Sequence, residues 1–205
     1  MKIAIIGTGN VGGALAQQLI KAGHTVLVGA RFPLSEKSIA LATKIGENRF
    51  TTVEGAVEQC EVIVLSVPAQ SAAATAASLG NVSGKVIIDT MNTVFIKLEG
   101  YSNTADAILA NCNTTDVVKC FNTTGFENML NPIYQEEGID MFTAGSSEKG
   151  IAIATQLAKD IGFGQVWHIG GNDKFYLIEQ MALSWINLAI LQKEGRDIAF
   201  KVIRR

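Results

Sequence analysis

The chain has 205 residues, 48% of them hydrophobic, and its 17 basic and 19 acidic residues give a net charge of −2 at neutral pH. Nearly balanced charge, with no basic cluster beyond Arg204–Arg205, excludes nucleic acid as a partner. There is no run of about 20 uncharged apolar residues to span a membrane, and the short apolar run at the N-terminus makes a poor signal peptide. A chain of this length is expected to form one domain that buries about 70% of its unfolded surface.

The number and spacing of the cysteines indicate the redox compartment of the protein and whether it has a metal site. Cys60, Cys112 and Cys120 are an odd number and lack C-x-x-C spacing, which indicates neither a disulfide framework nor a zinc site. We therefore expect a reduced, cytoplasmic protein that binds no metal.

The N-terminal stretch places a buried apolar strand, Lys2–Ile6, directly before a glycine turn. Gly7, Gly9 and Gly12 form the pattern G-x-G-x-x-G. The first glycine permits a tight turn, the second lets the backbone approach a pyrophosphate, and the third lets the next helix pack closely. An amphipathic helix and a second strand, Thr25–Gly29, follow. This βαβ unit predicts a dinucleotide site, with the anion bound by free N–H groups at the helix start.

The two residues after the second strand indicate which dinucleotide is bound. NAD-dependent folds usually carry Asp or Glu there, to hold the ribose 2′-hydroxyl, but this chain has Arg31. A carboxylate would repel a 2′-phosphate, whereas an arginine fork pairs with one. Thr8 and Lys37 can add a hydroxyl and a second positive charge, although Lys37 equally fits a solvated helix residue. We therefore expect NADP as the cofactor.

Beyond this unit, helices and strands alternate as in a doubly wound, mostly parallel, Rossmann-like α/β sheet. The pattern predicts helices over Ser35–Ile45, Glu54–Gln59, Ala69–Leu79, Thr104–Ala110 and Glu148–Ile161. It predicts strands over Phe50–Thr52, Glu61–Val67, Lys85–Asp89, Asp116–Cys120, Asp140–Ala144 and Val166–Ile169. A C-terminal apolar helix, Phe175–Leu191, completes the fold. We expect a cofactor-binding domain over 1–171 and a helical extension over 172–205 that packs on it.

Ligands of such sheets lie at the carboxyl ends of the strands where the strand order reverses. Ser66, Val67 and Pro68 end one buried strand and are candidates for the ribose and nicotinamide side. Val67 and Pro68 equally fit ordinary strand-end residues.

Two further strand ends carry polar side chains. Asn92 follows the strand after Pro68, and it is interpreted as a cofactor contact. Asn122 and Thr123 follow the next strand and are interpreted as substrate contacts. Because both strand ends belong to the same edge of the sheet, we expect them to face each other across one crevice.

Few titratable residues suit acid–base catalysis, and none is assigned as catalytic. His24 follows a helix-ending glycine and fits a turn, while His168 lies in the last strand. Asp89 and Glu179 are the carboxylates expected to be buried, as hydrogen-bonded structural groups.

The chain resembles the deazaflavin-dependent NADP reductase family through four segments in order: GTGNVGGALAQQLIKAGHTVLVGAR, VIIDTMN, VVKCFNT and GRDIAFKV. The same fold forms the cytosolic nicotinamide-binding domain of membrane metalloreductases. The resemblance implies three groups of contacts: Thr8, Gly9, Asn10 and Val11 at the pyrophosphate, Ala30, Arg31 and Lys37 around the 2′-phosphate, and Val67 near the nicotinamide ribose. Ala30 departs from a frequent Ser, which removes one phosphate hydrogen bond. Asn122 stands where the archaeal enzymes have His near the deazaflavin.

The resemblance and the predicted site agree on hydride transfer between NADPH and a small-molecule redox acceptor such as a flavin or deazaflavin. Two alternatives stay open. One is a non-catalytic NADP(H)-binding redox sensor, and the other is a ketone or imine reductase of the pyrroline-carboxylate type, for which a long helical second domain is expected. The sequence identifies neither the acceptor nor the direction of the reaction.

The last helix predicts the oligomeric state. Phe175–Leu191 is apolar on nearly all sides, and one face packed on its own sheet cannot bury that much surface. A homodimer would cover the excess.

Overall fold

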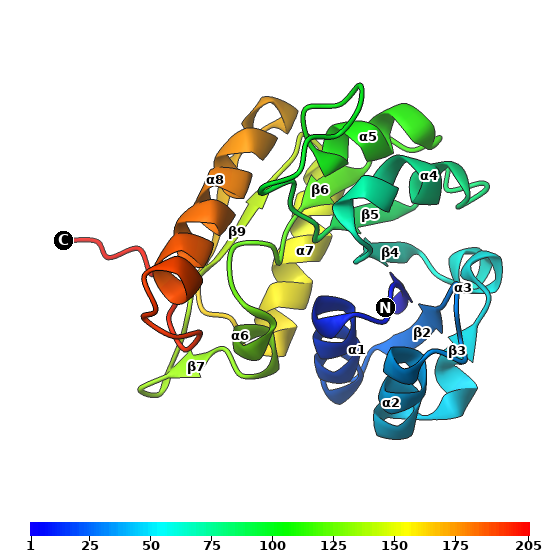
Figure 1. The fold of residues 1–205 in the computed structure, drawn as a ribbon, viewed down its shortest axis with the longest axis horizontal. Coiled ribbons are helices and arrows are strands. Elements are labelled where there is room, and N and C mark those ends of the chain that lie inside the picture. The colour runs from blue at the N-terminus through cyan, green and yellow to red at the C-terminus, as the bar shows by residue number, and fades with distance from the viewer.

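An eight-stranded sheet forms the centre of the protein, whose computed structural model describes residues 1–205 (Figure 1). Its strands are β1 (Lys2–Ile6), β2 (Thr25–Gly29), β3 (Phe50–Thr51), β4 (Val62–Leu65), β5 (Val86–Asp89), β6 (Val117–Lys119), β9 (Met141–Ala144) and β10 (Val166–Gly170). They lie in the order β10-β9-β6-β5-β4-β1-β2-β3. All neighbours pair in parallel except β6 and β9. A separate antiparallel hairpin joins β7 (Ile133–Tyr134) and β8 (Glu137–Gly138).

Helices cover both faces of this sheet, because its central strands are apolar on both sides. One apolar cluster packs the sheet against α1 (Asn10–Lys21), α2 (Glu36–Ile45), α6 (Phe126–Leu130) and α7 (Glu148–Ile161). The other packs it against α3 (Val53–Gln59), α4 (Ala72–Ala77), α5 (Thr104–Asn111) and α8 (Phe175–Ile186). Alternate residues of β1 enter opposite clusters, Ile3 and Ile5 on one side and Ala4 and Ile6 on the other. The predicted doubly wound fold with a C-terminal helix is confirmed.

The strand order explains where a ligand can bind. From β1 the chain moves outward to β2 and β3, and it then returns to the other side of β1 to form β4, β5 and β6. Helices therefore leave the ends of β1 and β4 on opposite faces, and this opens a crevice at the carboxyl ends of these strands. The glycine turn that follows β1 lies at this point.

Strand β9 closes one side of the carboxyl edge. It pairs with β6 only through Lys119 and Ala144, the last residue of each strand, and runs in the opposite direction. Its first residue, Met141, therefore lies beyond the end of β6, where it contacts Thr123.

Short elements depart from the sequence pattern. Helix α6 and the hairpin β7–β8 were not predicted, because five-residue and two-residue elements carry too little periodicity. The predicted helix Ala69–Leu79 divides into a 3₁₀ turn, η2 (Ala69–Ser71), and α4, and further 3₁₀ turns lie at η1 (Glu47–Arg49) and η3 (Asn172–Lys174). The last helix ends as a π-helical turn, η4 (Asn187–Leu191). The longest helix, α7, has 14 residues, and no helix of the chain meets the length and apolarity that a bilayer crossing needs.

Candidate functional site

The glycine turn after β1 is tight against the sheet and open at one residue. Gly7 has φ +122°, which disfavours any side chain, and a Cβ placed there would lie 2.1 Å from Ser66 O. A Cβ at Gly12 would lie 2.4 Å from Gly7 O, so this glycine is needed for packing. A Cβ at Gly9 would meet nothing within 4 Å. The turn therefore leaves space beside Gly9, where a ligand can approach the backbone.

This space lies at the start of α1, whose first turn has no side-chain cap. Gly9 is the N-cap residue, and the N–H groups that follow it at Asn10 and Val11 are available to an anion. A groove of about 180 Å³ extends from here between α1, α2 and α6. Its lining residues include Thr8, Gly9, Asn10 and Lys37. The structure thus brings together residues that the sequence assigned to the pyrophosphate and the 2′-phosphate. A second hollow, about 260 Å³, lies between β7–β8 and Lys201 and is lined by none of the predicted site residues.

Three hydroxyl groups connect the glycine turn with the start of α2. Ser38 Oγ donates to Phe32 O (2.8 Å) and lies 3.1 Å from Thr8 Oγ1 and 2.9 Å from Ser35 Oγ. Since the single Ser38 hydroxyl proton goes to Phe32 O, the Thr8 and Ser35 hydroxyls both donate to Ser38. Ser35 also caps α2 by accepting from Ser38 N. Sequence reasoning missed Ser35 and Ser38 as neighbours of the site, although their spacing at a helix start is a capping signal. They place two hydroxyls close to the hydroxyl of Thr8.

Arg31 follows β2 with its charge unpaired. Its side chain is exposed, and none of the ion pairs in the chain includes it. The guanidinium carbon lies 5.3 Å from the centre of the exposed Phe32 ring. An uncompensated guanidinium after the strand that pairs with β1 is suited to a phosphate.

The two asparagines at the ends of β5 and β6 meet as expected. Asn92 Nδ2 donates to Asn122 O (3.0 Å), and Asn122 Nδ2 donates to Asn92 Oδ1 (2.8 Å). Thr123 is buried, and its hydroxyl lies 3.9 Å from Met141 Sδ, on the side of β9. At the end of β4, Ser66 and Val67 are half-buried and Pro68 is exposed.

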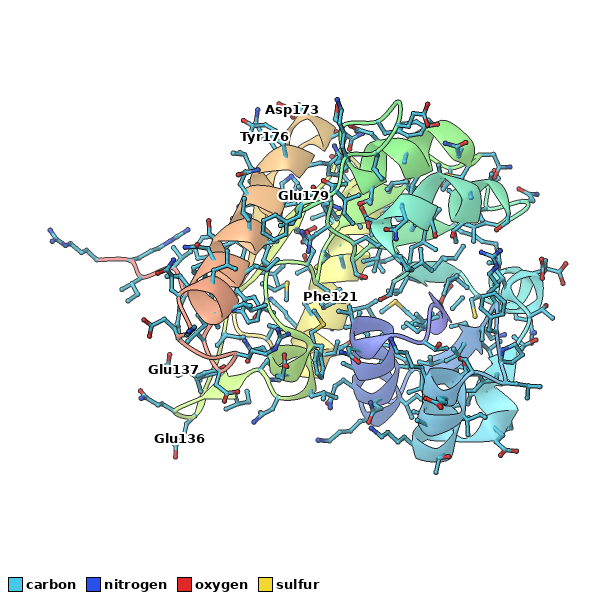
Figure 2. The ribbon with its side chains drawn as sticks, in the orientation of Figure 1. Phe121, Glu136, Glu137, Asp173, Tyr176 and Glu179 are labelled. Atoms are coloured by element: carbon cyan, nitrogen blue, oxygen red, sulfur yellow. The ribbon has the colours of Figure 1, made fainter.

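A buried ion cluster underlies this edge. Lys119 is fully buried and donates to Asp89 Oδ2 (2.6 Å), Met91 O (2.8 Å) and Thr104 Oγ1 (2.8 Å), which uses all three of its protons. Glu179 Oε1 lies 3.1 Å from Lys119 Nζ as an ion pair. Figure 2 shows Glu179 on the inner side of α8. The expected burial of Asp89 and Glu179 is confirmed, but Lys119 was missed, because a charged residue at a strand end is usually exposed.

Glu179 also contacts the loop after Asn92. Its Oε2 accepts from both the backbone N–H and the hydroxyl of Thr93. The cluster therefore joins α8 to the ends of both β5 and β6.

The histidines lie apart from the glycine turn and the paired asparagines, as do Cys60 and Cys112, whereas Cys120 directly follows β6 and is fully buried. His24 precedes β2, at the opposite edge of the sheet, and its Nε2 lies 3.0 Å from Asp160 Oδ2. His168 is an exposed residue of β10. Burial raises the pKa of all three thiols, and it raises the pKa of Cys120 to about 12. Cys120 is therefore a protonated, unreactive group at neutral pH.

A Rossmann sheet with an open glycine turn at the switch point and an arginine after β2 is the arrangement of a dinucleotide-binding fold. Residues 2–93 match the family model described as NADP oxidoreductase, coenzyme F420-dependent, so this part of the chain is similar to that family. The expected family resemblance and the expected class, an NADP-dependent oxidoreductase, are thereby confirmed.

Individual proteins show how far the similarity extends. Rat metalloreductase STEAP3 is 28% identical over 122 residues, which cover 59% of this chain and 24% of that protein. A candidate F420-dependent NADP reductase from Arthrobacter sp. FB24 has the same fold over 100% of both chains (TM-score 0.82, 24% identity). A reductive aminase from Aspergillus terreus, solved with NADPH and ethyl-5-oxohexanoate, matches 94% of this chain and 60% of its own (TM-score 0.61, 18% identity). The chain thus spans about a quarter of the metalloreductase and about three fifths of the aminase.

Proposed function

We propose that this protein transfers a hydride between NADPH and a flavin-like, deazaflavin or other small-molecule redox acceptor. The observation that carries this proposal is the open backbone at Gly9 after β1, together with the unpaired charge of Arg31 after the neighbouring strand β2. Space for a pyrophosphate and a cation for a 2′-phosphate lie at the same edge of the sheet, which is what an NADP site requires.

Each part of the edge then has its own role. Gly9, Asn10 and Val11 hold the pyrophosphate through backbone N–H groups, next to the turn made by Gly7 and Gly12. Arg31 holds the 2′-phosphate, with Thr8, Ala30 and Lys37 around it. The nicotinamide half lies along Ser66, Val67, Pro68 and Asn92, with Asn122 and Thr123 on the acceptor side. The bound cofactor supplies the hydride, and these residues orient it.

The chemistry of the edge favours an acceptor that needs little proton transfer from the protein. Asp89 and Glu179 are buried and both pair with Lys119, so the three hold the strand ends in place. The groups left at the crevice are the amides of Asn92 and Asn122 and the hydroxyls of Ser66 and Thr123, which orient a ring by hydrogen bonds. Reduction of a flavin-like ring suits such a site.

A ketone or imine reductase remains the second candidate, because the aminase fold covers 94% of this chain. Anaerobic stopped-flow oxidation of NADPH separates the two. Reaction with a flavin, deazaflavin, quinone or ferric chelate supports the first proposal, and reaction with only cyclic imines or ketones supports the second. NADPH binding without oxidation by any of these acceptors would indicate a redox sensor.

A matched pair of glycine variants tests the cofactor site itself. In Gly9→Val the new side chain enters open space, so the thermal midpoint should change little while NADP affinity falls at least tenfold. In Gly12→Ala the Cβ meets Gly7 O, so the fold itself should be destabilised. Unchanged NADP affinity in Gly9→Val would place the cofactor elsewhere.

The proposal also includes the oligomeric state and the cellular location of the protein. We propose a homodimer formed through α8 and η4, since Tyr176, Leu188, Ile190 and Leu191 of this segment are exposed although large and apolar. Residues 172–205 form an extension of the domain over 1–171, and Phe175 and Ile178 share its core. The free thiols of all three cysteines support a cytoplasmic location.

A further inference from the structure

The pair of asparagines at the edge has only one consistent orientation. Asn122 O is a carbonyl and can only accept, so the Asn92 atom that faces it is the Nδ2 donor. The Asn92 atom that faces the Asn122 side chain is therefore the acceptor Oδ1, and the Asn122 atom that donates to it is Nδ2. The remaining atom of the Asn122 amide is Oδ1, an acceptor.

Asn122 Oδ1 has no donor in the chain. It is covered from solvent, and the residue is only 4% exposed. Burying an acceptor without a partner is costly, so such an atom calls for an explanation. Two other buried side-chain atoms also lack a hydrogen bond, Glu179 Oε1 and Thr143 Oγ1. Lys119 compensates the first, and the second lies within β9, so only Asn122 Oδ1 belongs to the crevice.

The residue before Asn122 has a strained backbone conformation. Phe121 has φ 60°, an unusual value for a bulky residue. Its ring is buried, with its centre 6.2 Å from that of Phe163, and Figure 2 shows it in the interior of the molecule. This packing holds the left-handed conformation, which directs Asn122 toward Asn92. Strain of this kind is characteristic of functional sites.

The loop that follows Asn92 contains a second residue with an unusual backbone conformation. Ile96 N donates to Thr93 O (2.8 Å), which closes a turn whose third residue, Phe95, has φ 66°. A turn of this type favours glycine at that position. The Phe95 ring is 77% exposed, so packing does little to hold this side of the turn, whereas Thr93, directly after Asn92, is bonded to Glu179.

We propose that Asn122 Oδ1 accepts a hydrogen bond from the carboxamide N–H of the nicotinamide ring. This inference rests on the proposed function, which brings the nicotinamide half to these strand ends. The carboxamide is the N–H donor of that half, and it is the same chemical group that Asn92 presents to Asn122 in the free chain. The Asn92–Asn122 pair therefore keeps the Asn122 amide in the orientation in which Oδ1 can accept from the carboxamide N–H. Cofactor binding then exposes this oxygen to the nicotinamide.

Equilibrium binding tests the inference without measuring turnover. Calorimetry compares NADP⁺ with its 3-acetylpyridine analogue, in which a methyl group replaces the carboxamide NH₂. The unmodified protein should prefer NADP⁺ by about tenfold, equivalent to about 1.4 kcal/mol. Asn122→Ala should bring this ratio to within about twofold of unity, and it should leave the affinity for 2′,5′-ADP unchanged. Asn111→Ala is the control and should keep the full ratio. It removes a half-buried asparagine at the end of α5 that donates to the Tyr101 hydroxyl.

The outcomes are separable. If the unmodified protein binds both dinucleotides equally, the inference is wrong, and this result needs no variant to fold. It is also wrong if Asn122→Ala binds 2′,5′-ADP normally and keeps the tenfold ratio. If the unmodified protein binds neither dinucleotide, the proposed function fails, and the inference fails with it.

Discussion

Replacement of Arg31 changes cofactor choice without disturbing the fold. The side chain is exposed and forms no ion pair, and its only aromatic contact is with Phe32, which is itself exposed. Arg31→Ala therefore removes the unpaired cation that follows β2 and removes no core packing. The thermal midpoint should stay within about 2 °C, which for a chain of this size corresponds to less than about 1 kcal/mol.

The size of the effect follows from the exposure of the guanidinium. A hydrogen bond to a charged group contributes about 1.5 to 3 kcal/mol, and solvent screening of an exposed pair favours the lower end. Arg31→Ala should therefore weaken NADPH binding about tenfold and change NADH binding little. Arg31→Asp should invert the preference, because a carboxylate repels the 2′-phosphate and accepts from a 2′-hydroxyl.

Calorimetry with NADPH and NADH on the three proteins decides the matter. Lys44→Ala is a matched control, since Lys44 lines the same groove at the far end of α2, and its cofactor preference should stay close to that of the unmodified protein. Equal NADH and NADPH affinities in the unmodified protein would refute the assignment of Arg31.

Three further predictions address the strand ends, the core and the assembly. Asn92→Ala and Asn122→Ala should each slow hydride transfer at least tenfold in stopped flow while 2′,5′-ADP binding stays within about twofold; equal losses in both measurements would mean that these residues support the fold. Burial raises the pKa of the Cys120 thiol from 9.0 in the unfolded chain to about 12, so its stabilisation is complete below pH 9, falls by about 1 kcal/mol at pH 10 and continues to fall toward pH 12. Urea unfolding at pH 8 and 10 should show a smaller loss in Cys120→Ala; the same loss in both proteins would contradict this. Sedimentation at micromolar concentration should show a dimer that Leu191→Glu dissociates, and a 21.8 kDa species alone would exclude it.

Much of the fold was predictable because its strongest signals are local. The run Val62–Leu65 is apolar throughout and ends before Pro68, and it forms a central strand. Ser35 and Ser147 begin helices by accepting from the backbone N–H three residues on, as the capping pattern predicts. The glycine turn was recognisable since its residues lie within six positions of one another.

What escaped prediction depends on residues far apart in the chain. Burial of Lys119 requires Asp89 and Glu179, which lie 30 and 60 residues away, and no local pattern reports such a pairing. The orientation of the Asn122 amide likewise depends on Asn92. The reversal of β9 is set by tertiary packing, and its sequence resembles any other buried strand.

The ion cluster under the carboxyl edge makes α8 and the strand ends a single mechanical unit. Glu179 belongs to the helix that we propose to meet a second copy of the chain, and its carboxylate contacts both Lys119 and Thr93. A shift of α8 on association would move the residue next to Asn92. Self-association and cofactor affinity then become thermodynamically linked, and reciprocity requires that NADPH strengthen the dimer by the same factor by which the dimer strengthens NADPH binding.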